Sequence, residues 1–332
     1  MTGLSVGRVI GRWLLRVTAV IGLMQVAAVA AGAQPYPTAT VRIVFGLSPG
    51  SSSDVMARIL AERVSEKWGK PVVIENRPGA GGNIAADVVS KSTPDGYTLL
   101  LTNVSIAIAP SFYRKLNYDP VKDLVAVTGL GIAPHVLCVN PALPIKSVRD
   151  LIAAAKAKPG ELMFSSAGVG QTDHMATELF AQMAGIRMTH IPYKGGPPAL
   201  QAVMTGEVAL DFPGVAAALP FMRSGKVRCL AVTTKTRSSV VPDLPTLQEE
   251  GIQGYEHSLW NGIFAPTGTP SEIVAKVSAD FAEVLKRPDV IERLAGLGID
   301  SLGNSPKEFN AFFRAEVAKW ATVIKTIGIA AD

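Results

Sequence analysis

The chain has 332 residues, of which 48% are hydrophobic and 18% are charged, and this composition excludes an intrinsically disordered protein. Its length is sufficient for two lobes of roughly 100 to 150 residues each. The formal net charge is +5, but Lys and Arg form no long run, which argues against a nucleic-acid-binding protein.

The first 33 residues have the features of an export signal. An apolar stretch over 17–31 follows three arginines and ends in the small-x-small sequence Ala31-Gly32-Ala33. An uncleaved membrane anchor is the alternative, but this stretch is shorter than the ~20 residues that a bilayer span requires. We therefore expect cleavage and a mature periplasmic chain that begins near Gln34, with about +2 of the +5 charges left. The arginines lost with the signal are Arg8, Arg12 and Arg16.

From Val41 onward, short β-branched runs alternate with helical patterns, as in sheets built from strand-helix-strand units. The first part of the chain predicts strands over 41–45, 72–75 and 97–101. It predicts one helix that begins near Asp54 and a second that follows the glycine-rich stretch 78–83.

The same order of elements begins again at Ser147, where a capping-box-like start predicts a helix that stops at Pro159-Gly160. Another helix follows the glycine-rich turn 167–171, and the C-terminal part is helical, including 309–327. Further strands are predicted over 162–165, 188–191, 208–212 and 227–233.

The chain has two cysteines, Cys138 and Cys229, and each lies in an apolar run typical of a buried strand. An oxidising periplasm would permit a disulfide between them. We favour two buried free thiols, because free cysteine is among the most buried residue types.

The sequence 46–50 matches the G-x-S-x-G nucleophile elbow of serine hydrolases and lies between a predicted strand and a predicted helix. In that elbow the residue after the serine donates its backbone N–H to the oxyanion hole. Here that residue is Pro49, which has no N–H. The motif therefore does not predict a hydrolase.

Other catalytic patterns also fail. Gly79 to Gly82 imitate part of a dinucleotide fingerprint, but Asn76-Arg77-Pro78 separate them from the preceding strand. No spacing suggests a zinc site, and no pair of acid-base carboxylates is identifiable. We expect no catalytic residue, metal or cofactor, and we read the histidines as surface or strand residues. They are His135, His174, His190 and His257.

Two helix starts are the outstanding candidates for a binding site. Ser51 to Ser53 precede Asp54, and 167–172 precede Asp173. Unsatisfied N–H groups and the helix dipole make such starts natural anion sites, although these side chains could simply cap their helices. Lys194, in a loop after a strand, could reach an anion or remain solvated. The candidate ligand-binding residues are Ser48, Ser51, Ser52, Ser53, Asn103, Ser166, Ala167, Gly168, Gly170, Gln171, Thr172, Lys194 and Gly195.

The sequence resembles the Bug-type substrate-binding proteins of tripartite tricarboxylate transporters over essentially the whole mature chain. The segments that carry the resemblance are 44–50 with Asp54, 75–83, 94–99, 166–170 with His174, 192–196, 230–233, 245–246, Trp260 and 265–266. The resemblance implies an α/β type II periplasmic binding protein fold, with two lobes joined by hinge strands. It also implies that 48–53 and 166–172 each bind one carboxylate group of the ligand, partly through ordered water. The family usually has a second glycine where this chain has Ser51, so the identity of the ligand does not transfer.

We expect a signal peptide over 1–33, a first lobe over 34–134 and 259–332, and a second lobe over 135–258. The expected function is a monomeric periplasmic solute-binding protein that captures a small organic acid between the lobes. It would deliver this ligand to a tripartite tricarboxylate-type transporter whose membrane permease subunits are encoded elsewhere. The alternative is a periplasmic sensor that passes such a ligand to a signalling partner. An enzyme is disfavoured for lack of catalytic groups, and a cytoplasmic regulator because the signal segment replaces a DNA-binding domain.

Overall fold

The computed structural model describes residues 36–47 and 49–328, and from Ala39 onward the chain forms one compact unit. The predicted signal peptide lies outside the described residues and stays a prediction. In the described ranges, no helix combines the length and the apolarity that crossing a membrane requires.

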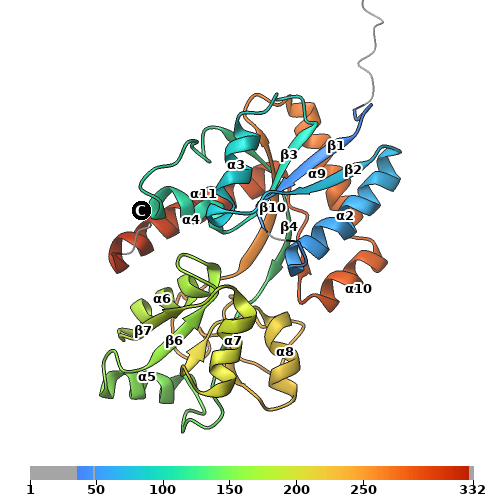
Figure 1. Cartoon of the computed structure of the whole chain (residues 1–332). Helices are drawn as coiled ribbons and strands as arrows, with labels where there is room; N and C mark the ends of the chain where they lie inside the picture. Colours follow the sequence, from blue (N-terminus) through green and yellow to red (C-terminus); the bar gives the residue numbers. More distant parts are fainter. Residues whose placement is uncertain (1–35, 48, 329–332) are drawn as a thin grey trace, which may run out of the picture. The chain divides into compact units, whose positions relative to one another are not determined.

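A six-stranded sheet has the order β11-β4-β10-β3-β1-β2 (Figure 1). Strand β1 pairs in parallel with β2 and β3, whereas β10 is antiparallel to both β3 and β4. Helices α2, α9 and α10 lie on one face of this sheet, and α3, α4 and α11 lie on the other (Figure 1). The strands are β1 (Val41–Phe45), β2 (Val72–Asn76), β3 (Thr98–Asn103), β4 (Leu124–Ala133), β10 (Leu259–Pro266) and β11 (Asp300–Ser301). The helices are α2 (Ser52–Trp68), the 3-10 turn η1 (Ala80–Gly82), α3 (Asn83–Ser90), α4 (Ser105–Phe112), α9 (Ser271–Leu285), α10 (Pro288–Gly296) and α11 (Pro306–Ile327).

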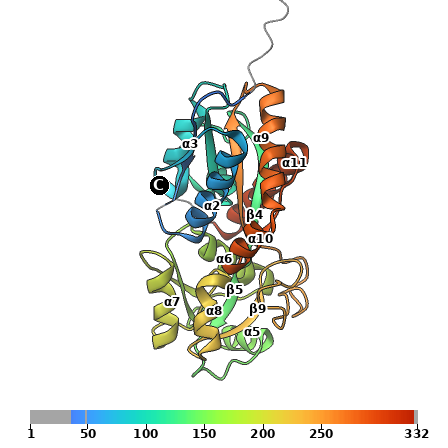
Figure 2. The same ribbon diagram turned by 90° about the vertical axis from the view of Figure 1, so that its right-hand side faces the viewer.

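A five-stranded sheet has the order β7-β6-β8-β5-β9. Strand β6 pairs in parallel with β7 and β8, and β5 is antiparallel to β8 and β9. Figure 2 shows α5, α7 and α8 around β5 and β9. The strands are β5 (Val136–Val139), β6 (Met163–Ser166), β7 (Thr189–Pro192), β8 (Leu210–Asp211) and β9 (Arg228–Val232). The helices are α5 (Val148–Ala157), α6 (Thr172–Ala184), α7 (Gly196–Thr205) and α8 (Val215–Arg223).

Helix α2 illustrates how the sequence forms these elements. Ser51 caps its start by accepting the N–H of Asp54, and Gly69 ends it in the left-handed conformation. Its inward face includes Met56, Ile59 and Leu60, which are at most 4% exposed. This apolar stripe is the one that the sequence predicts, and it buries against the sheet.

Each sheet has one position at which the strand order reverses. Strand β1 lies between β2 and β3, and β6 lies between β7 and β8. In open α/β sheets, ligands bind outside the carboxyl ends of the strands at such a switch point. In this chain those ends carry the segments after Phe45 and Asn103 in one sheet and after Ser166 and Asp211 in the other.

The chain passes from one sheet to the other between β4 and β5 and returns before β10. The predicted lobe boundaries, after 134 and after 258, fall in these two connections. The boundaries themselves stay predictions.

Cys138 and Cys229 form a disulfide, so the prediction of two free thiols is wrong. The two residues are 91 positions apart in sequence but are register partners on the antiparallel strands β5 and β9, with their Cα atoms 4.0 Å apart. Such proximity permits a bridge, and it depends on a strand pairing that neither apolar run reveals alone.

Candidate functional site

The turn between β1 and α2 is organised around Asp54, which is only 2% exposed. Its Oδ2 accepts the backbone N–H of Gly50 at 3.0 Å and Nε of Arg58 at 3.0 Å, and its Oδ1 accepts Nδ2 of Asn76 at 2.8 Å. Burial alone raises the pKa of Asp54, but the hydrogen bonds from Arg58, Gly50 and Asn76 outweigh burial and hold it below its usual value. The first turn is therefore braced by an ionised carboxylate.

Two glycines bring the loops after β1 and β2 into contact. A Cβ atom on Gly46 would lie 2.6 Å from the Cα of Gly82, which is closer than real side chains approach. Gly82 itself has a φ of 95°, which glycine adopts readily. The glycine-rich stretch thus allows the backbones of these two loops to pack closely together beside the start of α2.

The turn between β6 and α6 is organised around Asp173, which is 5% exposed. Its Oδ2 accepts the N–H of Ala167 at 2.6 Å, and its Oδ1 accepts the N–H of His174 at 2.9 Å. Ser166 Oγ accepts the N–H of Gly168 at 3.2 Å and lies 2.6 Å from Nε2 of His190. These bonds fix the backbone of the second turn.

Asp173 and Asp211 have an unusual electrostatic environment. Burial, the largest effect, raises the pKa of Asp173 to about 6 against the hydrogen bonds that lower it. Burial and the nearby carboxyl of Asp173 raise the pKa of Asp211 well above its usual value. Asp211 Oδ1 accepts the N–H of Phe212 at 2.7 Å, while Oδ2 has no partner in the described part of the chain. Both effects favour the protonated form of Asp211.

Thr172, the first residue of α6, contacts a pair of buried histidines beside the segments that connect the sheets. Its Oγ1 lies 3.2 Å from Nε2 of His135, and the ring of His135 lies 5.1 Å from that of His257. Burial lowers the pKa of His135 to about 4 and that of His257 well below its usual value. The interpretation of the histidines as surface or strand residues is wrong for His174 and His257, which are buried in a helix and a loop.

A third loop packs against the second turn. The N–H of Tyr193 donates to Ser166 O at 2.9 Å, and the N–H of Gly195 donates to Ala167 O at 3.1 Å. Lys194 is exposed at the tip of this loop. Its side chain is therefore available to solvent or to an anion.

The structure places Ser51, Ser52, Ser53 and Asn103 at the carboxyl ends of β1 and β3, and it places 166–172 and Gly195 beyond β6 and β7. A Cβ on Gly170 would lie 2.5 Å from the ring of Phe112, so the second turn touches the end of α4. Phe112 is a contact that the sequence does not predict. Ser48 lies outside the described residues, and its predicted role stays a prediction.

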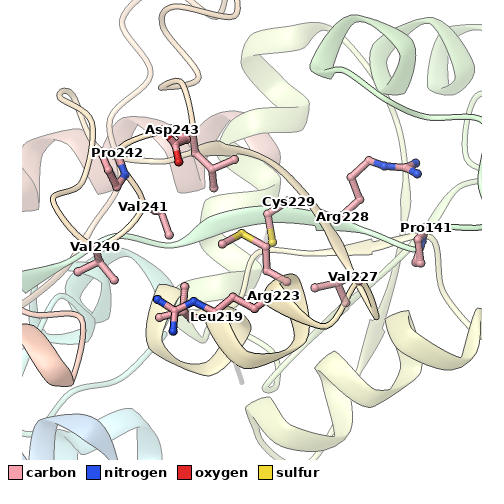
Figure 3. Close-up of a pocket in the computed structure, with 13 residues that line it drawn as sticks. Pro141, Leu219, Arg223, Val227, Arg228, Cys229, Val240, Val241, Pro242 and Asp243 are labelled. Carbon is pink, nitrogen blue, oxygen red and sulfur yellow. The ribbon is translucent and has the colours of Figure 1, made fainter.

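A separate cavity of about 660 Å³ lies beside β9 and α8 (Figure 3). Its lining includes Leu219, Met222, Arg223, Val240 and Cys229. It contains none of the residues at the two switch points, so we do not assign the ligand site to it. Among the described residues, no cluster of three or more His, Cys, Asp or Glu side chains is placed to hold a metal ion.

Two α/β lobes, each with a strand-turn-helix at its switch point, define a periplasmic binding protein fold, as the sequence predicts. Residues 56–329 match the model of the tripartite tricarboxylate transporter family receptor, and the chain belongs to this family.

Similar proteins agree with this assignment and confirm the resemblance seen in the sequence. Protein BugT of Bordetella pertussis is 38% identical over 320 residues, which cover 95% of this chain and 98% of BugT. The solved structure of R. palustris Rpa4515 with adipate has a TM-score of 0.79 and 38% identity, covering 89% of this chain and 99% of that one. MatC (Rpa3494) from Rhodopseudomonas palustris with bound malate has a TM-score of 0.75 and 32% identity, covering 87% and 100%.

Proposed function

We propose that this protein is a monomeric periplasmic receptor that binds a small di- or tricarboxylate through the two turns and delivers it to a tripartite tricarboxylate-type transporter. The observation that carries the proposal is that the same strand-turn-helix arrangement occurs in both sheets. Each sheet has a helix start at its switch point, and in each an aspartate inside the helix accepts a loop N–H and fixes the turn. Two such turns match a ligand with two acidic groups.

The physical basis is anion binding by oriented N–H groups and hydroxyls at helix starts. Hydrogen bonds to a charged group contribute roughly 1.5 to 3 kcal/mol each. About four to six of them are compatible with micromolar binding, near −8 kcal/mol, after the cost of ordering and closure. No catalytic step is part of this mechanism, and closure around the ligand would give the shape that the permease recognises.

Two further observations support the proposal. The relatives solved with adipate and malate are similar to this chain over nearly their whole lengths, and both of those ligands are dicarboxylates. The disulfide between Cys138 and Cys229 is typical of an oxidising compartment such as the periplasm.

The test is a thermal-shift screen of the chain from Gln34 against di- and tricarboxylates, with their amides as neutral controls, followed by calorimetry. A ligand that binds only the folded state raises the melting temperature, and the rise grows with ligand concentration. At 100 times Kd the free energy of unfolding increases by about 2.7 kcal/mol. We expect a saturable shift with at least one carboxylate and none with its amide. A shift with neutral compounds alone would contradict the proposed anion site.

The two turns are then tested separately. Ser51→Ala and Thr172→Ala should each weaken binding about tenfold, because each removes a hydroxyl from a helix start at the site. Ser271→Ala removes an exposed hydroxyl at the start of α9, far from both switch points, and should leave binding unchanged. Equal effects of all three substitutions would argue against the assignment.

A further inference from the structure

Asn261 lies on β10, between β3 and β4. Its register partners are Asn103 on β3 and Gly131 on β4. Directly opposed residues in neighbouring strands project to the same face of a sheet, so all three positions share one face. Asn261 is thus next to the carboxyl end of β3, at the switch point of this sheet.

Helix α2 covers this face. A Cβ on Gly131 would lie 3.5 Å from Sδ of Met56, which is in the second turn of α2. Ser53 is three residues before Met56 and therefore points to the same side of the helix, and it is only 3% exposed. The side chain of Asn261 consequently lies beneath the start of α2, the helix start assigned above to carboxylate binding.

The amide of Asn261 is not satisfied by the protein. The residue is 0% exposed, and within 36–47 and 49–328 neither Oδ1 nor Nδ2 has a hydrogen-bond partner. Asn103 differs, because its Oδ1 accepts the N–H of Ser105 at 2.9 Å and so fixes the entry to α4. An amide carries two donors and an acceptor oxygen, and leaving a buried polar group unpaired is destabilising.

Packing does not explain an amide at this position. On its own face of β10 the next residue is Ile263, which is fully buried and hydrophobic, whereas Trp260 and Phe264 pack against Phe309 of α11 on the other face. A leucine of similar volume would leave no unpaired polar atom in such a strand. Buried polar groups without a protein partner call for a specific explanation, and recognition of a ligand is the one that fits this location.

We propose that Asn261 is a specificity-determining residue of the ligand site. Its amide hydrogen-bonds, directly or through one water, a hydroxyl or keto group that the ligand carries beside the carboxylate bound at the start of α2. This inference rests on the proposed function and narrows the ligand to hydroxy- or keto-carboxylates. An amide both donates and accepts, as a hydroxyl does, whereas a methylene in the same place leaves the amide unpaired.

The experiment compares acids that differ by one hydroxyl: malate with succinate, and 2-hydroxyglutarate with glutarate. Calorimetry on the wild-type chain from Gln34 should give at least tenfold tighter binding for the hydroxylated member of one pair. In Asn261→Leu the ratio of the two dissociation constants should fall to about one, because the side-chain amide that distinguishes the hydroxylated acid from the other is gone. Asn261→Leu should also raise the melting temperature of the unliganded protein, since it removes a buried unpaired amide.

Ser51→Ala is the matched control. It should weaken both members of a pair alike and leave their ratio unchanged, because it acts on the shared carboxylate. Asn261→Ser provides a smaller replacement if the leucine variant does not fold, and its ratio should also fall.

The outcomes separate the two proposals. Binding of carboxylates with a ratio near one in the wild type, or with a ratio unchanged in a folded Asn261 variant, overturns the role of Asn261 and leaves the proposed function intact. If no carboxylate of any kind binds, the proposed function fails and the role of Asn261 fails with it.

Discussion

The two turns of the candidate site share one geometry and differ in electrostatics. In each, an aspartate in the first turn of a helix accepts an N–H from the loop before it: Asp54 from Gly50, and Asp173 from Ala167. Asp54 pairs with Arg58, whereas Asp173 has the carboxyl of Asp211 for a neighbour. The two turns thus have the same backbone hydrogen bond, but Arg58 balances the charge of Asp54, whereas burial disfavours the charged form of Asp173.

The difference gives the turns opposite responses to pH. The folded-state pKa of Asp54 lies below its usual value, so its contribution to stability is present above that value and is lost as the pH falls. The folded-state pKa of Asp173 is raised to about 6, so its contribution is present at low pH and is lost as the pH rises through about 6. A rise in pH therefore stabilises the folded protein through Asp54 and destabilises it through Asp173.

The largest effect should come from the disulfide, which is in the second sheet only. Replacing both Cys138 and Cys229 by alanine should lower the free energy of unfolding by about 2 to 5 kcal/mol, because the bridge closes a long loop. Urea unfolding with and without a reductant measures this. The reductant should lower the midpoint of the wild type and leave the double variant unchanged, and an equal response of both would contradict the prediction.

The second prediction tests the carboxyl pair. Asp211→Asn removes a buried carboxyl that faces Asp173, while His174 remains as the other titratable neighbour of Asp173. Stability at pH 7.5 relative to pH 5 should rise by about 1 to 2 kcal/mol, since the substitution removes the raised pKa of Asp211 and with it the stability that is lost as this carboxyl ionises. Urea unfolding across this pH range is the measurement.

Asp54→Asn is the matched comparison for Asp211→Asn. Asp54 accepts hydrogen bonds from Gly50, Arg58 and Asn76 and is ionised throughout this range, so the change should lower stability by about the same amount at pH 5 and at pH 7.5. It should not relieve any loss of stability between pH 5 and pH 7.5. If both variants changed the pH profile in the same direction, the contrast between the two turns would be wrong.

The smallest effect concerns the helix caps. Ser51 accepts the N–H of Asp54 at 3.2 Å, whereas Gln171 precedes α6 without a side-chain cap. Ser51→Ala should lower the free energy of unfolding by about 1 kcal/mol, and Gln171→Ala by less than about 0.5 kcal/mol. Thermal and urea unfolding without ligand measure both, and a larger loss for Gln171→Ala would reverse the comparison.

Much of the fold is predictable because local patterns determine it. The strand predicted over 41–45 is β1, and the apolar stripe that begins at Met56 is the buried face of α2. Helix α4 is not predicted, because it is short and mostly apolar, contains Pro110 and has no amphipathic periodicity. It packs on the C-terminal helix α11, and this tertiary contact decides its conformation.

The candidate site is predictable only in part, because some of its features are local in sequence and others depend on tertiary contacts. Serines and glycines between a strand and a helix identify the two turns, which are local features. Asp211 comes close to Asp173, and Asn261 to Asn103, only through the tertiary fold, and the members of each pair are far apart in sequence. The disulfide is missed for this reason too, since the pairing of β5 with β9 alone brings the cysteines together.

The contact between Gly46 and Gly82 constrains how this receptor can diversify. The backbones of two loops touch there, so any side chain at Gly46 would push apart the frame around the start of α2. Sequence change that alters ligand preference must therefore spare this pair and act on positions whose side chains can vary without moving the backbone, such as Ser51 and Asn261. The glycine contact thus fixes the backbone of the candidate site, and its polar side chains are left to determine which ligand it prefers.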